Sequence, residues 1–134
     1  MPQRASRTGP ARELAITAAR TAEDNNAEDI VVLDLRGISP VTDYFVICSG
    51  TSGRQMRTVA DEAAKAAAKM GQRVWKTSGM DAGGWILLDF VDVVVHIFDK
   101  QRRAHYDLEL IWGEAPKVKW ARPASQGSRE VGPR

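Results

Sequence analysis

Cysteine is almost absent from this chain of 134 residues, in which Cys48 is the only one. A single thiol cannot form an intramolecular disulfide, so the sequence does not fit a disulfide-stabilised secreted domain. The chain also lacks any apolar run close to the roughly 20 residues that span a bilayer. Its first residues contain no h-region of a signal peptide. These absences predict a cytoplasmic protein with no membrane association.

Motifs for nucleotide or metal chemistry are also missing. Neither the P-loop pattern nor Gly-x-Gly-x-x-Gly occurs, and no Gly-x-Ser-x-Gly elbow surrounds a serine. The only histidines, His96 and His105, have no metal-ligand spacing with Cys48. The sequence therefore predicts no catalytic residue, no metal site and no cofactor.

The charges that are present are unevenly distributed. Residues 1–12 and 115–134 together carry eight basic side chains and one acidic one, whereas residues 13–114 carry 11 basic and 16 acidic ones. A nucleic-acid-binding domain would concentrate lysine and arginine on its folded part. An acidic body is better suited to a basic partner surface.

Hydrophobic periodicity predicts one α/β domain over residues 11–114, between a disordered start at 1–10 and a basic disordered tail at 115–134. Helices are expected over 11–25, 52–70 and 99–112. Strands are expected over 29–35, 44–48, 72–76, 85–90 and 93–98. This order predicts a mixed five-stranded sheet with flanking helices, in which the first two strands are antiparallel.

The segment Gly50-Thr51-Ser52-Gly53 opens the central helix and has two interpretations. Free N–H groups at a helix start can hold a phosphate. Alternatively, Ser52 and Gln55 form a capping box, in which each side chain bonds the other residue's backbone. The Asp-x-Asp strand of a metal-dependent nucleotidyltransferase is missing, so we favour the cap. A nucleotide-binding enzyme of that kind stays as the alternative function.

The expected hairpin over 85–98 has one purely apolar face and one mixed face. If Phe90 pairs with Val93, the mixed face carries Trp85, Leu87, Asp89, Val94, His96 and Phe98. Aromatic residues are enriched at interface cores, where a few side chains dominate affinity. The alternative is that the last helix half covers this face and that His96 is an ordinary sheet residue.

Several segments together resemble the ribosomal silencing factor (RsfS) family, also called Iojap-like. They are 34–36 (DLR), 42–50 (TDYFVICSG), 51–55 (TSGRQ), 85–89 (WILLD), 92–98 (DVVVHIF), 103–106 (RAHY) and 108–112 (LELIW). Each segment is modest alone, but their order and spacing over residues 11–114 make the resemblance specific.

The resemblance implies a nucleotidyltransferase-like fold without catalytic carboxylates and a non-enzymatic function. It implies binding to the large ribosomal subunit through the intersubunit-face protein numbered fourteen. The bound factor would block joining of the small subunit and repress translation when nutrients are scarce. Homodimers are common in the family. The partner-binding residues it implies are Trp85, Leu87, Asp89, His96, Phe98, Arg103 and Tyr106.

This chain departs from the family pattern at two places. Ser78-Gly79 stands where members usually have Glu-Gly, and Val91-Asp92 stands where they usually have Gly-Asp, so the hairpin turn is expected to differ. The basic tail after Ala115 either contacts ribosomal RNA through phosphates or is simply disordered. A general RNA-binding protein that works through its basic ends is a third interpretation.

Overall fold

The computed structural model describes residues 2–81, 84–100 and 113–123, with side chains from residue 9 onward. The elements are α1 (Pro2–Asp24), β1 (Glu28–Asp34), β2 (Tyr44–Gly50), α2 (Gly53–Lys69), β3 (Lys76–Ser78), β4 (Trp85–Asp89) and β5 (Val93–Asp99). The helix predicted over 99–112 lies almost entirely outside the described residues.

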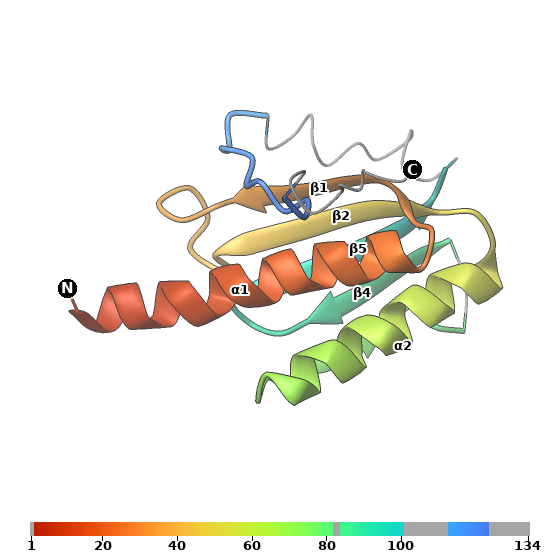
Figure 1. Ribbon diagram of the computed structural model, residues 1–134, viewed down its shortest axis with the longest axis horizontal. Coiled ribbons are helices and arrows are strands. Elements are labelled where there is room, and N and C mark those ends of the chain that lie inside the picture. Colours follow the sequence, from red (N-terminus) through yellow and green to blue (C-terminus); the bar gives the residue numbers. More distant parts are fainter. Residues whose placement is uncertain (1, 82–83, 101–112, 124–134) are drawn as a thin grey trace.

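The strands form one mixed sheet in the order β1-β2-β5-β4-β3 (Figure 1). β2 and β5 are parallel, and all other neighbours are antiparallel. The predicted α/β class and mixed five-stranded sheet are therefore confirmed. The nucleotidyltransferase-like relationship stays a prediction.

The predicted position of the third strand is wrong, because β3 occupies Lys76–Ser78 instead of residues 72–76. It is a short edge strand that pairs only with β4, through Lys76 opposite Asp89 and Ser78 opposite Leu87. Its position is therefore set by its partner, and its own residue pattern carries little information.

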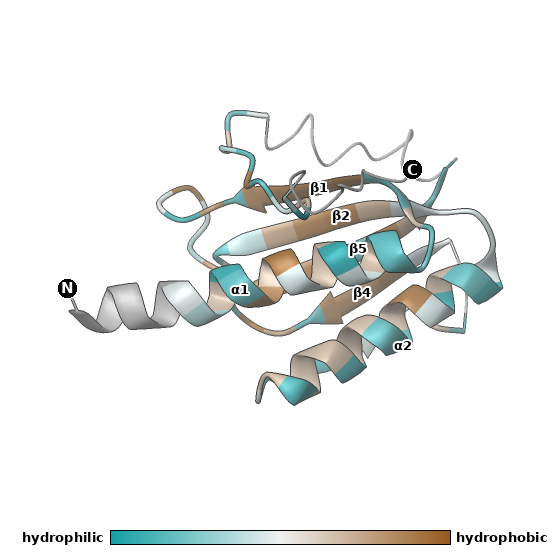
Figure 2. Cartoon of the chain, viewed as in Figure 1, coloured by the Kyte–Doolittle hydropathy of each residue, from teal (hydrophilic) through white to brown (hydrophobic). Residues whose placement is uncertain are grey.

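Both helices lie on one face of the sheet and enclose the main core (Figure 1). Small side chains such as Ala15, Ala19 and Ala63 are buried there, which lets the helices approach the strands closely. The strands contribute larger apolar groups, and Figure 2 shows β2 and β5 coloured mostly as hydrophobic. The apolar stripe predicted for the central helix is confirmed, because Met56, Val59, Ala63 and Ala67 are all buried.

α1 is longer than predicted. The expected disordered start at 1–10 is wrong for most of its length, since the helix begins at Pro2 and continues through Pro10. Proline is well tolerated in the first turn of a helix, and the Gln, Arg and Ala residues that follow favour helix. Pro10 lies inside the helix, where its ring removes one backbone hydrogen bond. Neither helix in the described part of the chain is long and apolar enough to cross a membrane.

We call residues 113–123 the C-terminal strap. The sequence predicts a disordered tail from residue 115, but residues 115–123 of the strap pack against the domain instead. Asp34 N–H donates to Pro116 O, and Val118 N–H donates to Val32 O, so the strap extends the sheet beyond β1. The Trp120 indole N–H donates to Ile30 O at 3.2 Å.

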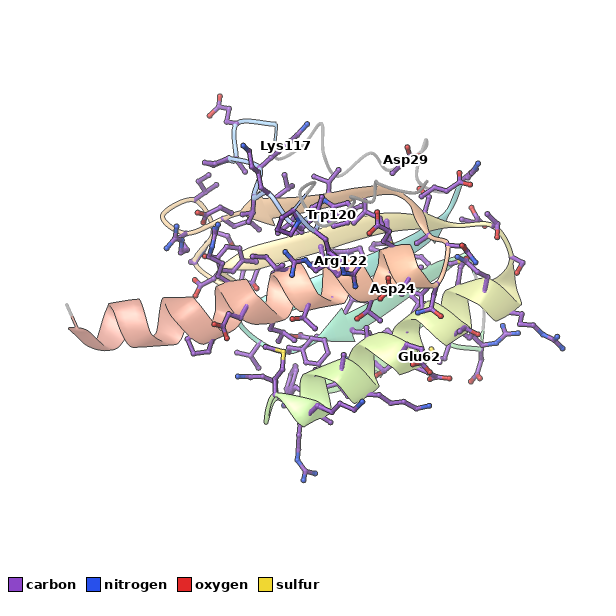
Figure 3. All side chains as sticks on the ribbon, in the orientation of Figure 1. Asp24, Asp29, Glu62, Lys117, Trp120 and Arg122 are labelled. Atoms are coloured by element: carbon purple, nitrogen blue, oxygen red, sulfur yellow. The ribbon has the colours of Figure 1, made fainter. Side chains whose placement is uncertain are left out.

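The strap then crosses from β1 to α1. Arg20 Nε donates to Trp120 O at 2.6 Å, and Arg122 forms a double hydrogen bond with the Asp24 carboxylate. Figure 3 shows Trp120, Arg122 and Asp24 at this crossing. Part of the basic charge assigned to a tail is therefore on the folded domain, and the Arg122 charge is paired.

Candidate functional site

The β4–β5 hairpin has the register that the sequence predicted. The observed pairs are Trp85–Phe98, Ile86–Ile97, Leu87–His96, Leu88–Val95 and Asp89–Val94. The apolar face belongs entirely to the core under the helices, and its six residues are Ile86, Leu88, Phe90, Val93, Val95 and Ile97. The mixed face therefore lies on the other side of the sheet, where the described residues place neither α1 nor α2.

Four ring side chains gather on this second face. Phe45 meets His96 edge to face with ring centroids 4.6 Å apart, and Trp85 stacks on Phe98 at 5.0 Å. The His96 and Phe98 rings are parallel to within 6°. Such pairs each contribute about 0.5–1.5 kcal/mol beyond the area they bury. They make this part of the sheet a rigid platform.

Burial divides the predicted contact residues into two groups. Phe98 and His96 are buried, so they pack beneath the exposed side chains of this face and are not themselves exposed to a partner. Trp85, Leu87 and Asp89 are half-buried and present part of their side chains to the outside. Arg103 and Tyr106 lie outside the described residues.

His96 is the electrostatically unusual residue of the site. Its Nδ1 accepts a hydrogen bond from Trp85 Nε1 at 3.3 Å, so in the neutral ring the proton lies on Nε2. Nε2 is buried and has no hydrogen-bond partner in the part of the chain that the structure describes. Burial lowers the pKa of His96 to about 4, which keeps the ring neutral at physiological pH.

An open pocket of about 610 Å³ lies beside the aromatic cluster. We call it the hairpin pocket. The described residues that line it are 39–42, Phe45, Trp75, Leu87, Asp89, Val91, Val94 and His96. At its rim Val41, Trp75 and Val91 are 80%, 70% and 54% exposed. This size is within the usual range for ligand and side-chain sites.

Leu87, Asp89 and His96, which were predicted as partner contacts, line this pocket, whereas its lining residues Val41, Thr42 and Trp75 were not predicted. The missed residues lie in loops, where a two-residue alternation gives no signal. The sequence feature that could have predicted them is a large apolar residue next to a turn, such as Trp75 directly before an edge strand.

The hairpin turn is formed by Val91 and Asp92, and Val91 adopts a backbone conformation that favours glycine. The predicted difference from the turn of other family members stays a prediction. Val91 has φ of 79°, and Asp92 N–H donates to Phe90 O at 3.0 Å. These features define a γ-turn of the rare and strained kind. The Asp89 carboxylate accepts from Val91 N–H at 2.7 Å and helps to hold the turn.

The start of α2 is a helix cap. Ser52 accepts from Gln55 N–H at 3.0 Å, as predicted. The Gln55 side-chain oxygen accepts from Thr51 N–H, one residue before the predicted partner. The described residues include no cluster of three or more His, Cys, Asp or Glu side chains able to hold a metal ion.

Comparisons with known proteins agree with the resemblance seen in the sequence. The family described as "Ribosomal silencing factor during starvation" matches residues 8–132. The ribosomal silencing factor RsfS of Bacillus subtilis is 48% identical over 99 residues, which cover 74% of this chain and 84% of that protein. The maize chloroplast protein Iojap is 35% identical over 104 residues, covering 78% of this chain and 45% of that longer protein.

Solved structures share the architecture. A crystal structure from Bacillus halodurans matches with a TM-score of 0.70 at 39% identity, covering 81% of this chain and 98% of the other. One from Chromobacterium violaceum matches with a TM-score of 0.73 at 29% identity, covering 86% and 95%. On these grounds the chain belongs to the ribosomal silencing factor family, which includes the Iojap-like proteins.

Proposed function

We propose that this protein represses translation by binding the large ribosomal subunit and blocking the joining of the small subunit when nutrients are scarce. It acts in the cytoplasm, without catalysis. Its partner is the intersubunit-face protein numbered fourteen. The observation that carries the proposal is the second face of the sheet. In a chain of this family, that face bears a preorganised aromatic cluster and an open apolar pocket.

The contact surface is centred on Trp85, Leu87 and Asp89. These side chains are half-buried on a rigid hairpin, so little conformational entropy is lost when a partner covers them. His96 and Phe98 hold Trp85 in place through ring contacts. Arg103 and Tyr106 complete the proposed surface.

Two further features support a partner on the large subunit. A mouse relative, 36% identical over 90 residues, is named "Mitochondrial assembly of ribosomal large subunit protein 1". The residues between the two basic ends are acidic overall, which complements a basic ribosomal protein.

Two additional contacts belong to this proposal. A homodimer would use the same sheet face and so compete with the ribosome. Lys117 and Lys119 are exposed on the strap and are available for incidental contacts with ribosomal RNA, whereas Arg122 already pairs with Glu23 and Asp24.

Co-sedimentation with purified large subunits tests the proposal. We expect the wild type to pellet with the subunits and Trp85→Ala to lose at least about tenfold in affinity, as expected for an interface hot spot. Lys65→Ala is the matched control, because Lys65 is exposed on α2, on the opposite side of the sheet. Circular dichroism verifies that each variant is folded.

A second readout separates silencing from simple binding. When small subunits are added, wild-type protein should reduce the yield of joined ribosomes on a sucrose gradient, and Trp85→Ala should not. If the wild type binds large subunits but leaves joining unchanged, the steric mechanism is wrong. If the wild type stays in the supernatant, the partner assignment is wrong.

A further inference from the structure

The rim of the hairpin pocket brings together apolar side chains from three separate segments. Val41 comes from the loop before β2, Trp75 from the approach to β3, and Val91 from the β4–β5 turn. Scattered exposed apolar residues need no explanation, but three that converge on one opening indicate a binding site.

The turn at Val91 adds an independent observation. A β-branched residue at φ of 79° is a backbone outlier, and glycine would adopt this conformation without strain. The valine adds an exposed apolar side chain at the pocket rim. Strained residues of this kind concentrate at binding sites.

Two buried polar atoms belong to residues that line the same pocket. Thr42 Oγ1 and His96 Nε2 have no hydrogen-bond partner among the described residues. Because His96 Nδ1 already accepts from Trp85, Nε2 carries the proton and needs an acceptor. Both atoms are enclosed, so the open pocket presents mainly its apolar walls, which fit a ligand with an apolar body.

The charge of the pocket narrows the choice of ligand. Among the described residues that line it only Asp89 is charged, and none is a lysine or arginine. At these residues a phosphate group, and therefore the backbone of RNA, would meet a carboxylate and no cation. A segment of a basic protein fits better, since it brings apolar side chains and positive charge toward Asp89.

We propose that the hairpin pocket is an anchor site that takes one large apolar side chain from a loop of the ribosomal protein partner. This inference rests on the proposed function and extends it. The contact surface centred on Trp85, Leu87 and Asp89 supplies most of the buried area. The pocket fixes the position of the partner along the sheet.

Two variants test the pocket without touching Trp85. Val94→Phe places a larger side chain at a half-buried position that lines the pocket, and so plugs it. Trp75→Ala removes an exposed rim residue, which leaves the core intact if Val94→Phe fails to fold. Ile38→Ala is the matched control, because Ile38 is also an exposed apolar loop residue but does not line the pocket.

Binding of each variant to purified large subunits is measured by co-sedimentation. We expect Val94→Phe and Trp75→Ala each to weaken binding at least tenfold and Ile38→Ala to bind like the wild type. If both pocket variants bind within twofold of wild type while Trp85→Ala does not bind, the anchor site is wrong and the proposed function stands.

The remaining outcomes are also decisive. If the wild type does not bind large subunits, the proposed function and the anchor site fall together. If Val94→Phe abolishes self-association in analytical ultracentrifugation but not ribosome binding, the occupant is a second copy of the chain, and a ribosomal loop is excluded. If isolated ribosomal RNA competes for the wild type and not for the Val94→Phe variant, the occupant is RNA, and the charge argument is wrong.

Discussion

Val91 combines a strained backbone conformation with an exposed apolar side chain. Its positive φ costs about 1–3 kcal/mol for a β-branched residue, and its exposed side chain recovers little of that by burial. Val91→Gly should therefore raise the free energy of unfolding by about 1 kcal/mol, after allowance for the greater freedom of glycine in the unfolded chain. Urea denaturation measures this change.

The same substitution should weaken binding to the large subunit, because it removes part of the pocket rim. A Val91→Gly variant that is more stable and binds less well would show that the backbone strain at Val91 is retained for partner binding. Lower stability in Val91→Gly would instead mean that the valine side chain packs more than its exposure indicates.

His96 makes stability depend on pH in a defined window. Its pKa is about 4 in the folded protein against 6.5 ordinarily, so below pH 6.5 the unfolded chain takes up a proton that the folded chain does not. Stability from this group is complete above pH 6.5 and is lost as the pH falls toward 4.

We expect the wild type to lose about 2 kcal/mol more than His96→Phe between pH 7.5 and 5. Urea titrations of both proteins measure the difference, and the other titrating groups are common to the two. The hydrogen bond from Arg36 lowers the pKa of Asp34 below its usual 3.8, so the effect of that carboxyl falls at lower pH. Equal losses in the two proteins would contradict a buried neutral imidazole.

Among the elements, the C-terminal strap offers the clearest test of a contact that the sequence did not reveal. Val118 is buried against the main core, while the neighbouring Lys119 is exposed. Val118→Ala should lower the free energy of unfolding by about 2 kcal/mol, through lost burial and the cavity left behind. Thermal or urea unfolding measures it.

Lys119→Ala is the control and should change stability by less than about 0.5 kcal/mol. If Val118→Ala is equally neutral, the strap does not contribute to the fold. The distinction matters for function, because a docked strap fixes where Lys117 is presented, beside Leu33 on the sheet edge.

The elements also differ in how far the sequence predicted them. The hairpin register followed from alternation along two strands joined by a very short turn, since a slip of one residue would exchange the two faces. The strap was missed because a basic stretch with proline resembles a tail, and its order comes from pairing with β1 and α1. Similarly, the burial of His96 and Phe98 depends on Phe45 and Trp85, which come from different strands.

At the scale of the whole molecule, a protein partner and an RNA partner differ in how strongly their binding affinity depends on salt concentration. Binding through 6–10 phosphate contacts loses about 10³–10⁵ in affinity between 50 and 200 mM salt. The described part of the proposed face instead has an aromatic cluster and an apolar pocket, with a single carboxylate among the described lining residues. Burial of apolar surface is not screened by salt.

We therefore expect affinity for the large subunit to fall by less than about tenfold over that salt range. Any remaining dependence of affinity on salt should come from the strap lysines. The double variant Lys117→Ala, Lys119→Ala should therefore reduce this dependence without abolishing binding. Co-sedimentation at four salt concentrations measures both slopes. A wild-type loss of a thousandfold, removed by the double variant, would transfer the main contact from the sheet face to the strap and make RNA the principal partner.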